Sequence, residues 1–204
     1  MADTNKPEGR VVLKDKTTPY KGFFQVDRYK FKYQKYEGGW SSVVVRELFE
    51  RGHTVAVLPY DPERDKVVLI EQFRIGAYAA GLEPWLSEAI AGIIDFGEKA
   101  EEVAHREALE EANCKLSELI KIGEFLMSPG GSSERTVMFC GRVDSRGVGG
   151  IHGLAHEGED ILAKVLPLEE ALRDIAVGKI VSAYAVIPLL WLQFNKASLQ
   201  AKWT

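Results

Sequence analysis

The sequence predicts an α/β protein in which a mixed β-sheet lies between helices, preceded by a small β unit. Apolar strand patterns at residues 54–60 and 66–72 enclose a turn-forming segment at 61–65. A helix-forming run without proline or glycine begins at Lys99, and further helical segments end the chain. With 204 residues, the chain is long enough for one sizeable domain and an extension.

Residues 1–52 are expected to form the small N-terminal β domain. Aromatic and apolar residues alternate with polar ones over 24–36, Gly38 and Gly39 then turn the chain, and a further strand follows at 42–48. A few strands bury too little apolar surface to be stable alone, so this domain must pack on another surface.

The main domain is expected to span residues 53–204. Pro188 should kink or restart the last helix, because proline cannot donate a hydrogen bond within it. The expected elements are strands at 54–60, 66–72, 88–94, 120–127, 135–143 and 161–166, and helices at 99–113, 168–177 and 182–202.

Three carboxylates crowd one side of the helix that begins at Lys99. Glu107, Glu110 and Glu111 are spaced by three and four residues, at which like charges repel on a helix. Hard cations take oxygen ligands, and Mg²⁺ usually combines a few carboxylates with water and substrate phosphate. The cluster therefore indicates a metal site that also holds phosphate, although an isolated Glu-Glu pair is more often a solvated acidic face.

The residues around these carboxylates fit the pattern G-x5-E-x7-R-E-U-x-E-E-x-G-U, in which U is a bulky aliphatic residue. Ala108 and Cys114 are small apolar substitutes at the U positions, and Asn113 replaces the closing glycine. Asparagine is the next-best residue for a left-handed helix cap, so the backbone should be preserved. This pattern is the Nudix box, and the chain resembles the Nudix hydrolases. The identical positions are Gly92, Glu98, Arg106, Glu107, Glu110 and Glu111.

A proline-glycine-glycine turn lies at 128–135, with the sequence SPGGSSER. Pro129 follows Asn113 by sixteen residues, a spacing that resembles the ADP-ribose pyrophosphatase branch of the Nudix family. The backbone N–H groups of such a turn, including that of Gly130, can approach an anion, while serine and glutamate can bind a sugar hydroxyl. We interpret the segment as a substrate loop, the alternative being a plain hairpin loop.

The stretch at 153–160, GLAHEGED, is similar to the mobile acidic loop of bacterial ADP-ribose pyrophosphatases. The resemblance implies that one loop glutamate acts as general base on the attacking water, and it places this role on Glu157, with Glu159 as the rival. Nearby glycines suit a lid that closes over substrate. A solvated acidic loop is the alternative.

The resemblance implies hydrolysis of ADP-ribose to AMP and ribose 5-phosphate with Mg²⁺, for which Mn²⁺ can substitute. The metal ligands would be Glu107, Glu111, Glu110 and the backbone carbonyl of Ala91, with Arg106 orienting the carboxylates. Phe23 would stack on adenine, Arg46 and Arg74 would bind adenine or phosphates, and Ser128 and Glu134 would face the terminal ribose. For Phe23 and the arginines, a core position and surface ion pairs are the alternatives.

Two other functions remain open on the sequence. The same metal site could hydrolyse another nucleoside diphosphate sugar, such as GDP-mannose or ADP-glucose, or the fold could serve as a sensor without turnover. Degenerate sensors usually lose box glutamates, and this chain keeps them all. In this branch, moreover, the N-terminal sheet exchanges between subunits, so the resemblance also implies a homodimer.

Composition is that of an ordinary globular protein, with 46% hydrophobic and 27% charged residues. A net charge of −4 and the lack of a basic stripe argue against a nucleic-acid partner. The N-terminus has no apolar signal core, and no run approaches the ~18 apolar residues that span a bilayer. Cys114 and Cys140 fit no metal-ligand spacing, so we expect reduced thiols in a cytoplasmic protein.

Overall fold

The computed structural model describes residues 9–154, 156 and 158–203, which form two compact units. The N-terminal unit contains the described residues up to Gly52 together with Leu126–Glu134. The core unit contains His53–Phe125 and the described residues that follow Glu134. The segment Leu126–Glu134, which carries the proline-glycine-glycine turn, therefore belongs with the first strands of the chain.

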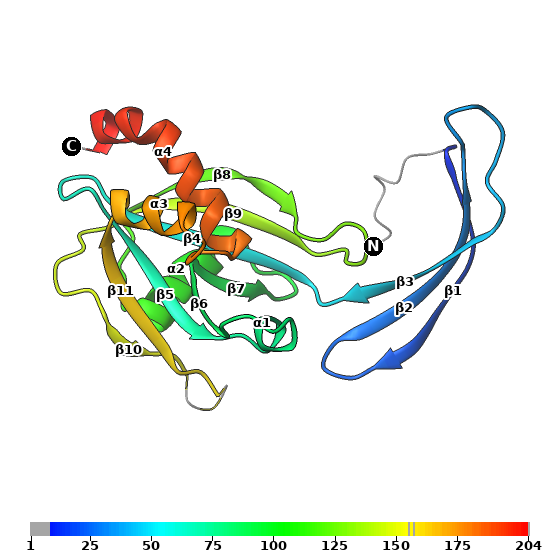
Figure 1. Cartoon of the computed structure of the whole chain (residues 1–204), viewed down its shortest axis with the longest axis horizontal. Coiled ribbons are helices and arrows are strands. Elements are labelled where there is room, and N and C mark those ends of the chain that lie inside the picture. Colours follow the sequence, from blue (N-terminus) through cyan, green and yellow to red (C-terminus); the bar gives the residue numbers. More distant parts are fainter. Residues whose placement is uncertain (1–8, 155, 157, 204) are drawn as a thin grey trace. The chain divides into compact units, whose positions relative to one another are not determined.

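The N-terminal unit is an antiparallel sheet of strands β1 (Val11–Lys21), β2 (Gln25–Tyr33) and β3 (Val44–Glu50), in that order (Figure 1). The sequence did not predict β1, which alternates poorly and is exposed along its whole length. The end of β3 holds the proline-glycine-glycine turn: Phe49 N–H donates to Gly131 O at 2.8 Å, and the Ser133 hydroxyl donates to the Glu50 carboxylate.

The core unit is built on one mixed sheet in the strand order β10-β11-β5-β4-β9-β8, with β6 pairing with β5 and β7 with β4. Strands β4 and β9 run parallel, whereas β7 and β5 are antiparallel to β4. The strands are β4 (His53–Asp61), β5 (Lys66–Phe73), β6 (Trp85–Glu88), β7 (Ile90–Ile94), β8 (Glu118–Leu126), β9 (Arg135–Arg142), β10 (Gly150–His152) and β11 (Ile161–Pro167).

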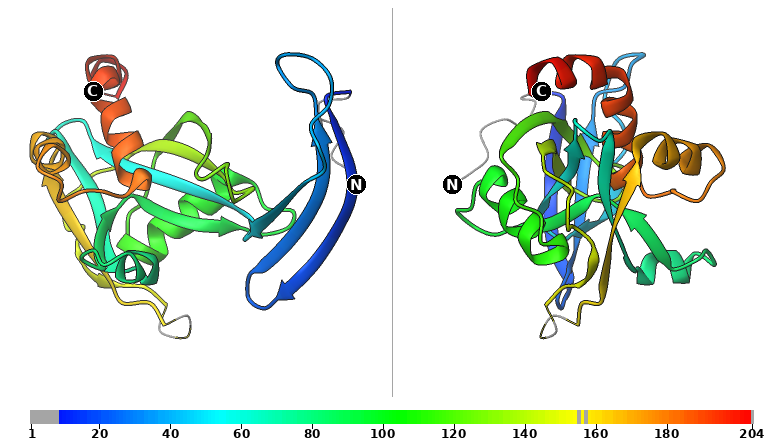
Figure 2. Two further views of the ribbon diagram at one scale, coloured as in Figure 1. Left: turned by 45° about the vertical axis from the view of Figure 1, so that its right-hand side comes forward. Right: turned by 90° about the vertical axis from the view of Figure 1, so that its left-hand side faces the viewer.

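Helices cover both faces of this sheet, α2 (Ala100–Ala112) one face and α3 (Leu168–Ala176) with α4 (Ala183–Trp203) the other (Figure 2, right). The strand pattern explains the layers, because successive side chains of a strand point to opposite faces. Val55 and Val57 of β4 pack in the cluster beneath α2, whereas Leu58 and Tyr60 pack in the cluster beneath α3 and α4. The predicted α/β/α sandwich with a mixed sheet and a separate N-terminal sheet is confirmed.

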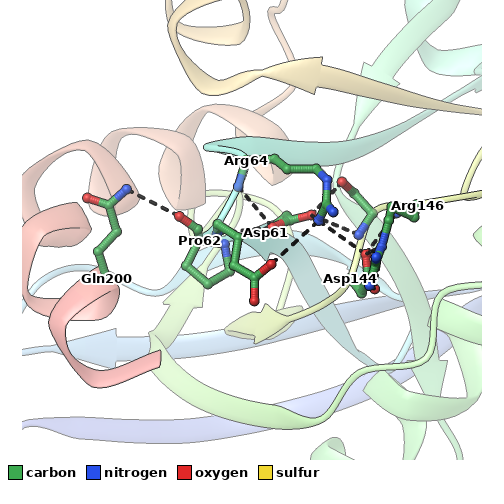
Figure 3. A network of polar contacts seen from close by, with 8 residues as sticks. Asp61, Pro62, Arg64, Asp144, Arg146 and Gln200 are labelled. Carbon is green, nitrogen blue, oxygen red and sulfur yellow. Dashed lines mark hydrogen bonds and ion pairs between the residues drawn. The ribbon is translucent and has the colours of Figure 1, made fainter. Parts of the chain in front are cut away.

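The turn at 61–65 joins β4 to β5 around a buried carboxylate. Asp61 accepts hydrogen bonds from the N–H groups of Glu63 and Arg64 at 3.1 Å, and from Ser145 N–H at 2.9 Å and its hydroxyl at 2.6 Å. The Arg64 guanidinium bridges Asp61 at 3.0 Å and Asp144 at 3.3 Å (Figure 3). Asp61 therefore ties the predicted turn to the segment after β9.

The remaining elements agree with the predicted order, with three additions. Strand β6, short helix α1 (Ile75–Ala79) and strand β10 were not predicted, and α4 continues as one helix through Pro188, where the sequence predicted a kink or restart. Asn113 caps α2 in the left-handed conformation, at φ 49° and ψ 34°, as its place in the motif predicted. Among the described helices, none combines the length and apolar character needed to cross a bilayer.

Candidate active site

Helix α2 presents the predicted carboxylates to strand β7. Alanine and glutamate favour the helix, and acidic side chains in its first turn complement the helix dipole. Its buried face consists mainly of small residues, which lets the helix backbone lie close to the sheet. These small residues, with one valine among them, are Val103, Ala104, Ala108 and Ala112.

The side chain of Glu107 lies directly over the backbone of β7. A Cβ atom built on Gly92 would stand 2.5 Å from Cγ of Glu107, and closer still to its carboxylate. Only glycine leaves room for the side chain at this point. Glu107 is consequently set deep, with 13% of its side chain exposed.

Glu111 lies one helical turn further and is almost fully buried, at 2% exposure. Its Oε2 accepts a hydrogen bond from the N–H of Ala91 at 3.0 Å. Burial raises the pKa of Glu111 to about 8, a rise that the Ala91 hydrogen bond opposes and the charges of Glu107 and Glu159 increase. Burial likewise raises the pKa of Glu107 to about 7, against the charge of Arg106.

Arg106 links the other carboxylates of the motif. Its Nη1 lies 2.8 Å from Oε1 of Glu107 and 3.0 Å from Oε2 of Glu110, and its Nη2 lies 3.9 Å from Glu98. Glu98 in turn accepts a hydrogen bond from Asp95 N–H at 2.9 Å. One guanidinium thus contacts three carboxylates, two of them on α2 and one on the segment that precedes it.

The glycine-rich segment after β10 is attached to this helix. Gly153 N–H donates to the carbonyl of Glu110 at 3.3 Å, and the Glu159 carboxylate accepts from Leu154 N–H at 3.0 Å. The charge of Glu159 raises the pKa values of Glu107 and Glu111, so it acts on the same carboxylate cluster. Glu157, the other predicted base, lies outside the described residues.

Arg74 follows strand β5 and belongs to the same unit as the carboxylates. Its Nε lies 2.6 Å from Oε2 of Glu88, and its charge opposes the rise in the pKa of Glu111. The structure therefore brings together those predicted site residues of the core unit that lie within the described ranges. They are Arg74, Ala91, Arg106, Glu107, Glu110, Glu111 and Glu159.

The other predicted substrate residues lie in the N-terminal unit. Phe23 is exposed and packs edge-on against Phe24, with ring centroids 4.7 Å apart, beside a hollow of about 320 Å³. Arg46 lies exposed on β3 and donates to Val45 O at 2.8 Å. Ser128 and Gly130 are exposed in the turn, whereas Glu134 is buried.

The sequence did not predict two charged residues that form ion pairs with Arg74 and Glu134. Glu88 holds Arg74, and Arg51 lies 3.4 Å from the buried carboxylate of Glu134 while its guanidinium stands over the Phe24 ring at 5.7 Å. A signal existed for Glu88, because it is a lone charge in the apolar stretch that leads to Gly92. No comparable pattern marks Arg51.

The carboxylates fit a hard divalent cation. Within the described ranges, no three carboxylate, imidazole or thiol groups converge as a complete metal cage. Mg²⁺ seldom uses such a cage, because one or two carboxylates usually hold it while water and substrate phosphate complete its shell. The buried charges of Glu107 and Glu111 would be compensated by such an ion, and their oxygen donors suit Mg²⁺ or Mn²⁺.

Comparison with known proteins finds a match to the NUDIX domain model over residues 44–184. A solved structure described as an ADP compounds hydrolase shares the fold, with a TM-score of 0.69 over 95% of this chain and 96% of that chain at 19% identity.

Curated relatives cover most of the sequence. The ADP-ribose pyrophosphatase of Escherichia coli (strain K12) is 48% identical over 91% of this chain and 89% of its own length. The ADP-ribose pyrophosphatase of Haemophilus influenzae is 47% identical over 91% and 87%. A GDP-mannose pyrophosphatase of Yersinia pestis is 32% identical over 86% and 87%.

Proposed function

Because this chain belongs to the Nudix hydrolase family, in its ADP-ribose pyrophosphatase branch, we propose that it hydrolyses ADP-ribose with Mg²⁺. The products are AMP and ribose 5-phosphate. The observation that carries the proposal is the pair of deep carboxylates, Glu107 over Gly92 and Glu111 beneath the Ala91 N–H. The names of the relatives that are 47–48% identical support this substrate.

The metal would be held by Glu107 and Glu111, with Glu110 and the Ala91 carbonyl as further ligands. When bound there, Mg²⁺ would neutralise the negative charge of the phosphate oxygens and lower the pKa of the attacking water. The positive charge of Arg106 offsets the repulsion between the carboxylates of Glu107 and Glu110, and its ion pairs fix their orientation.

In the reaction, a water oxygen forms a bond to one phosphorus, and the bond between that phosphorus and the bridging oxygen breaks. Glu157 or Glu159 accepts the proton that the water loses. The bridging oxygen leaves with the other phosphate, so water and ADP-ribose account for all atoms of the two products.

Substrate binding would use Arg74 on the core unit and Phe23, Arg46, Ser128, Gly130 and Glu134 on the N-terminal unit. Stacking on phenylalanine suits adenine, and arginine suits phosphate. Because β1 is exposed throughout, we also propose that residues 1–52 form a domain that exchanges strands in a homodimer. Both cysteines are buried free thiols, which supports a reducing, cytoplasmic setting.

The test is product analysis of the purified protein with ADP-ribose, with and without Mg²⁺, in water enriched with heavy oxygen. We expect AMP and ribose 5-phosphate only when metal is present, with the label on the phosphate that water attacked. Intact ADP-ribose in the presence of Mg²⁺ would refute the hydrolase proposal and favour a sensor.

A second candidate is hydrolysis of another nucleoside diphosphate sugar. The relative that is 32% identical and named GDP-mannose pyrophosphatase favours including this reaction in the test. GDP-mannose and ADP-glucose should therefore be compared with ADP-ribose under identical conditions. A kcat/KM for GDP-mannose above that for ADP-ribose would replace the first proposal with the second.

A further inference from the structure

Glu88 is a buried carboxylate to which the proposed reaction assigns no task. It ends strand β6, and 7% of its side chain is exposed. Both of its oxygens are engaged: Oε2 by Arg74 Nε at 2.6 Å, and Oε1 by the Ser182 hydroxyl at 2.5 Å. A buried carboxylate is costly unless it is paired in this way, so the contacts define one geometry.

Arg74, the partner of Glu88, uses only one edge of its guanidinium in this pair. Its side chain is 42% exposed, and within the described part of the chain its two terminal nitrogens make no hydrogen bond or ion pair. A guanidinium held at Nε presents those nitrogens as a fork, which matches two oxygens of a phosphate.

The backbone around Arg74 is fixed as well. Its N–H donates to Pro84 O at 2.8 Å, and its carbonyl accepts from Ala77 N–H at 3.1 Å at the start of α1. The remaining conformational freedom of Arg74 is in the rotamers of its long side chain, and the ion pair with the Glu88 carboxylate restricts these rotamers.

Ser182 connects Glu88 to the opposite face of the sheet. The Ser182 carbonyl accepts from Ala185 N–H at 3.0 Å and Val186 N–H at 2.9 Å, where α4 begins. Ala185 is itself fully buried in the cluster under α4. Glu88 is therefore anchored to a packed helix, and Arg74 is anchored to Glu88.

We propose that Glu88 is a positioning residue for substrate: it holds the Arg74 guanidinium so that its free edge receives a phosphate of the nucleoside diphosphate. The inference rests on the proposed function, because it assigns Arg74 to substrate. Ordering the arginine during folding removes a conformational cost that binding would otherwise carry.

The test compares Glu88→Gln with Glu71→Gln. Glu88→Gln keeps size and removes the charge that holds Arg74, so KM for ADP-ribose should rise about 10-fold with little change in kcat. Glu71→Gln removes a similar ion pair, with Lys164 at 2.7 Å on the same sheet, and should leave KM unchanged. A KM for Glu88→Gln equal to that of the wild type overturns the proposal.

A double-mutant cycle separates positioning from general damage. In an Arg74→Ala background, Glu88→Gln should cause no further rise in KM, because the residue it acts through is gone. The same 10-fold rise in that background contradicts the proposal. If Glu88→Gln does not fold, Ser182→Ala removes a single hydroxyl from the same carboxylate and should raise KM in the same direction, again only when Arg74 is present.

Calorimetric binding of ADP gives a readout that does not depend on turnover. Weaker ADP binding in Glu88→Gln but not in Glu71→Gln supports the positioning role even if the wild type cleaves no ADP-ribose, an outcome that refutes only the proposed function. Equal ADP affinity in wild type and Glu88→Gln refutes the positioning role even if ADP-ribose is hydrolysed.

Discussion

The side chain of Glu107 occupies the space in which a side chain at position 92 would begin, since a Cβ on Gly92 would stand 2.5 Å from Cγ of Glu107. The conflict is with a flexible side chain rather than with the backbone. A substitution at Gly92 should therefore displace the Glu107 carboxylate while leaving the fold in place.

We expect Gly92→Ala to lower kcat for ADP-ribose about 100-fold, because a catalytic group displaced by about 1 Å can cost that much. Circular dichroism should show an unchanged fold. Gly76→Ala is the matched control, since a Cβ there meets nothing within 4 Å and its backbone is ordinary helix. Full activity in Gly92→Ala would mean that the position of Glu107 does not matter for turnover.

Glu111→Gln should abolish most activity, by about 100-fold or more, and weaken the stabilisation by Mg²⁺. Added Mg²⁺ should raise the Tm of the wild type, because an ion that binds only the folded state stabilises it. The variant should show a smaller rise. Glu102→Gln, which changes an exposed glutamate of the same helix, should behave as the wild type. Equal Mg²⁺ shifts in all three proteins would exclude Glu111 as a ligand.

The same buried carboxyl predicts how the metal-free protein responds to pH. Since burial raises the pKa of Glu111 from 4.5 to about 8, its favourable contribution is complete below pH 4.5 and is lost as the pH rises through about 8. Denaturant unfolding in a chelator should show a loss of stability between about pH 4.5 and pH 8 that is smaller in Glu111→Gln. Parallel curves for the two proteins would contradict this assignment.

Asp61→Asn should destabilise the protein by about 2 kcal/mol, without reducing the activity of the folded fraction. Burial alone would raise the pKa of Asp61, but the hydrogen bonds from Ser145 and Arg64 outweigh it and hold the pKa below 3.8. The contribution of Asp61 is therefore present above pH 3.8 and lost as the pH falls through the lower folded value. Urea midpoints of both proteins should converge on acidification; a constant difference from pH 7 to pH 3 would refute the argument.

For the general base, we expect Glu157→Gln to lose more turnover than Glu159→Gln. The Glu159 carboxylate already accepts a hydrogen bond from Leu154 N–H, so it is partly committed to shaping the loop. The measurement is single-turnover cleavage of ADP-ribose at saturating Mg²⁺ across pH. A larger loss in Glu159→Gln would transfer the role of base to that residue.

Local patterns predicted most of the fold and the helix that carries the carboxylate cluster. The helix from Ala100 to Ala112, its asparagine cap and the turn at 61–65 follow from residue types at short spacing. Strand β1 could not be predicted in this way, because it has no buried face and its residues do not alternate between apolar and polar. Glu88 with Arg74 and Arg51 with Glu134 also escaped prediction, because such contacts depend on how distant strands are paired.

The proline-glycine-glycine turn and the motif helix belong to different compact units, the turn with β3 and the helix with the core sheet. We therefore expect substitutions in Leu126–Glu134 to leave the packing beneath Glu107 and Glu111 unchanged, since none of these residues belongs to that cluster. Under the proposed function, this separation allows the sugar-binding turn to change under selection while the carboxylate helix is retained.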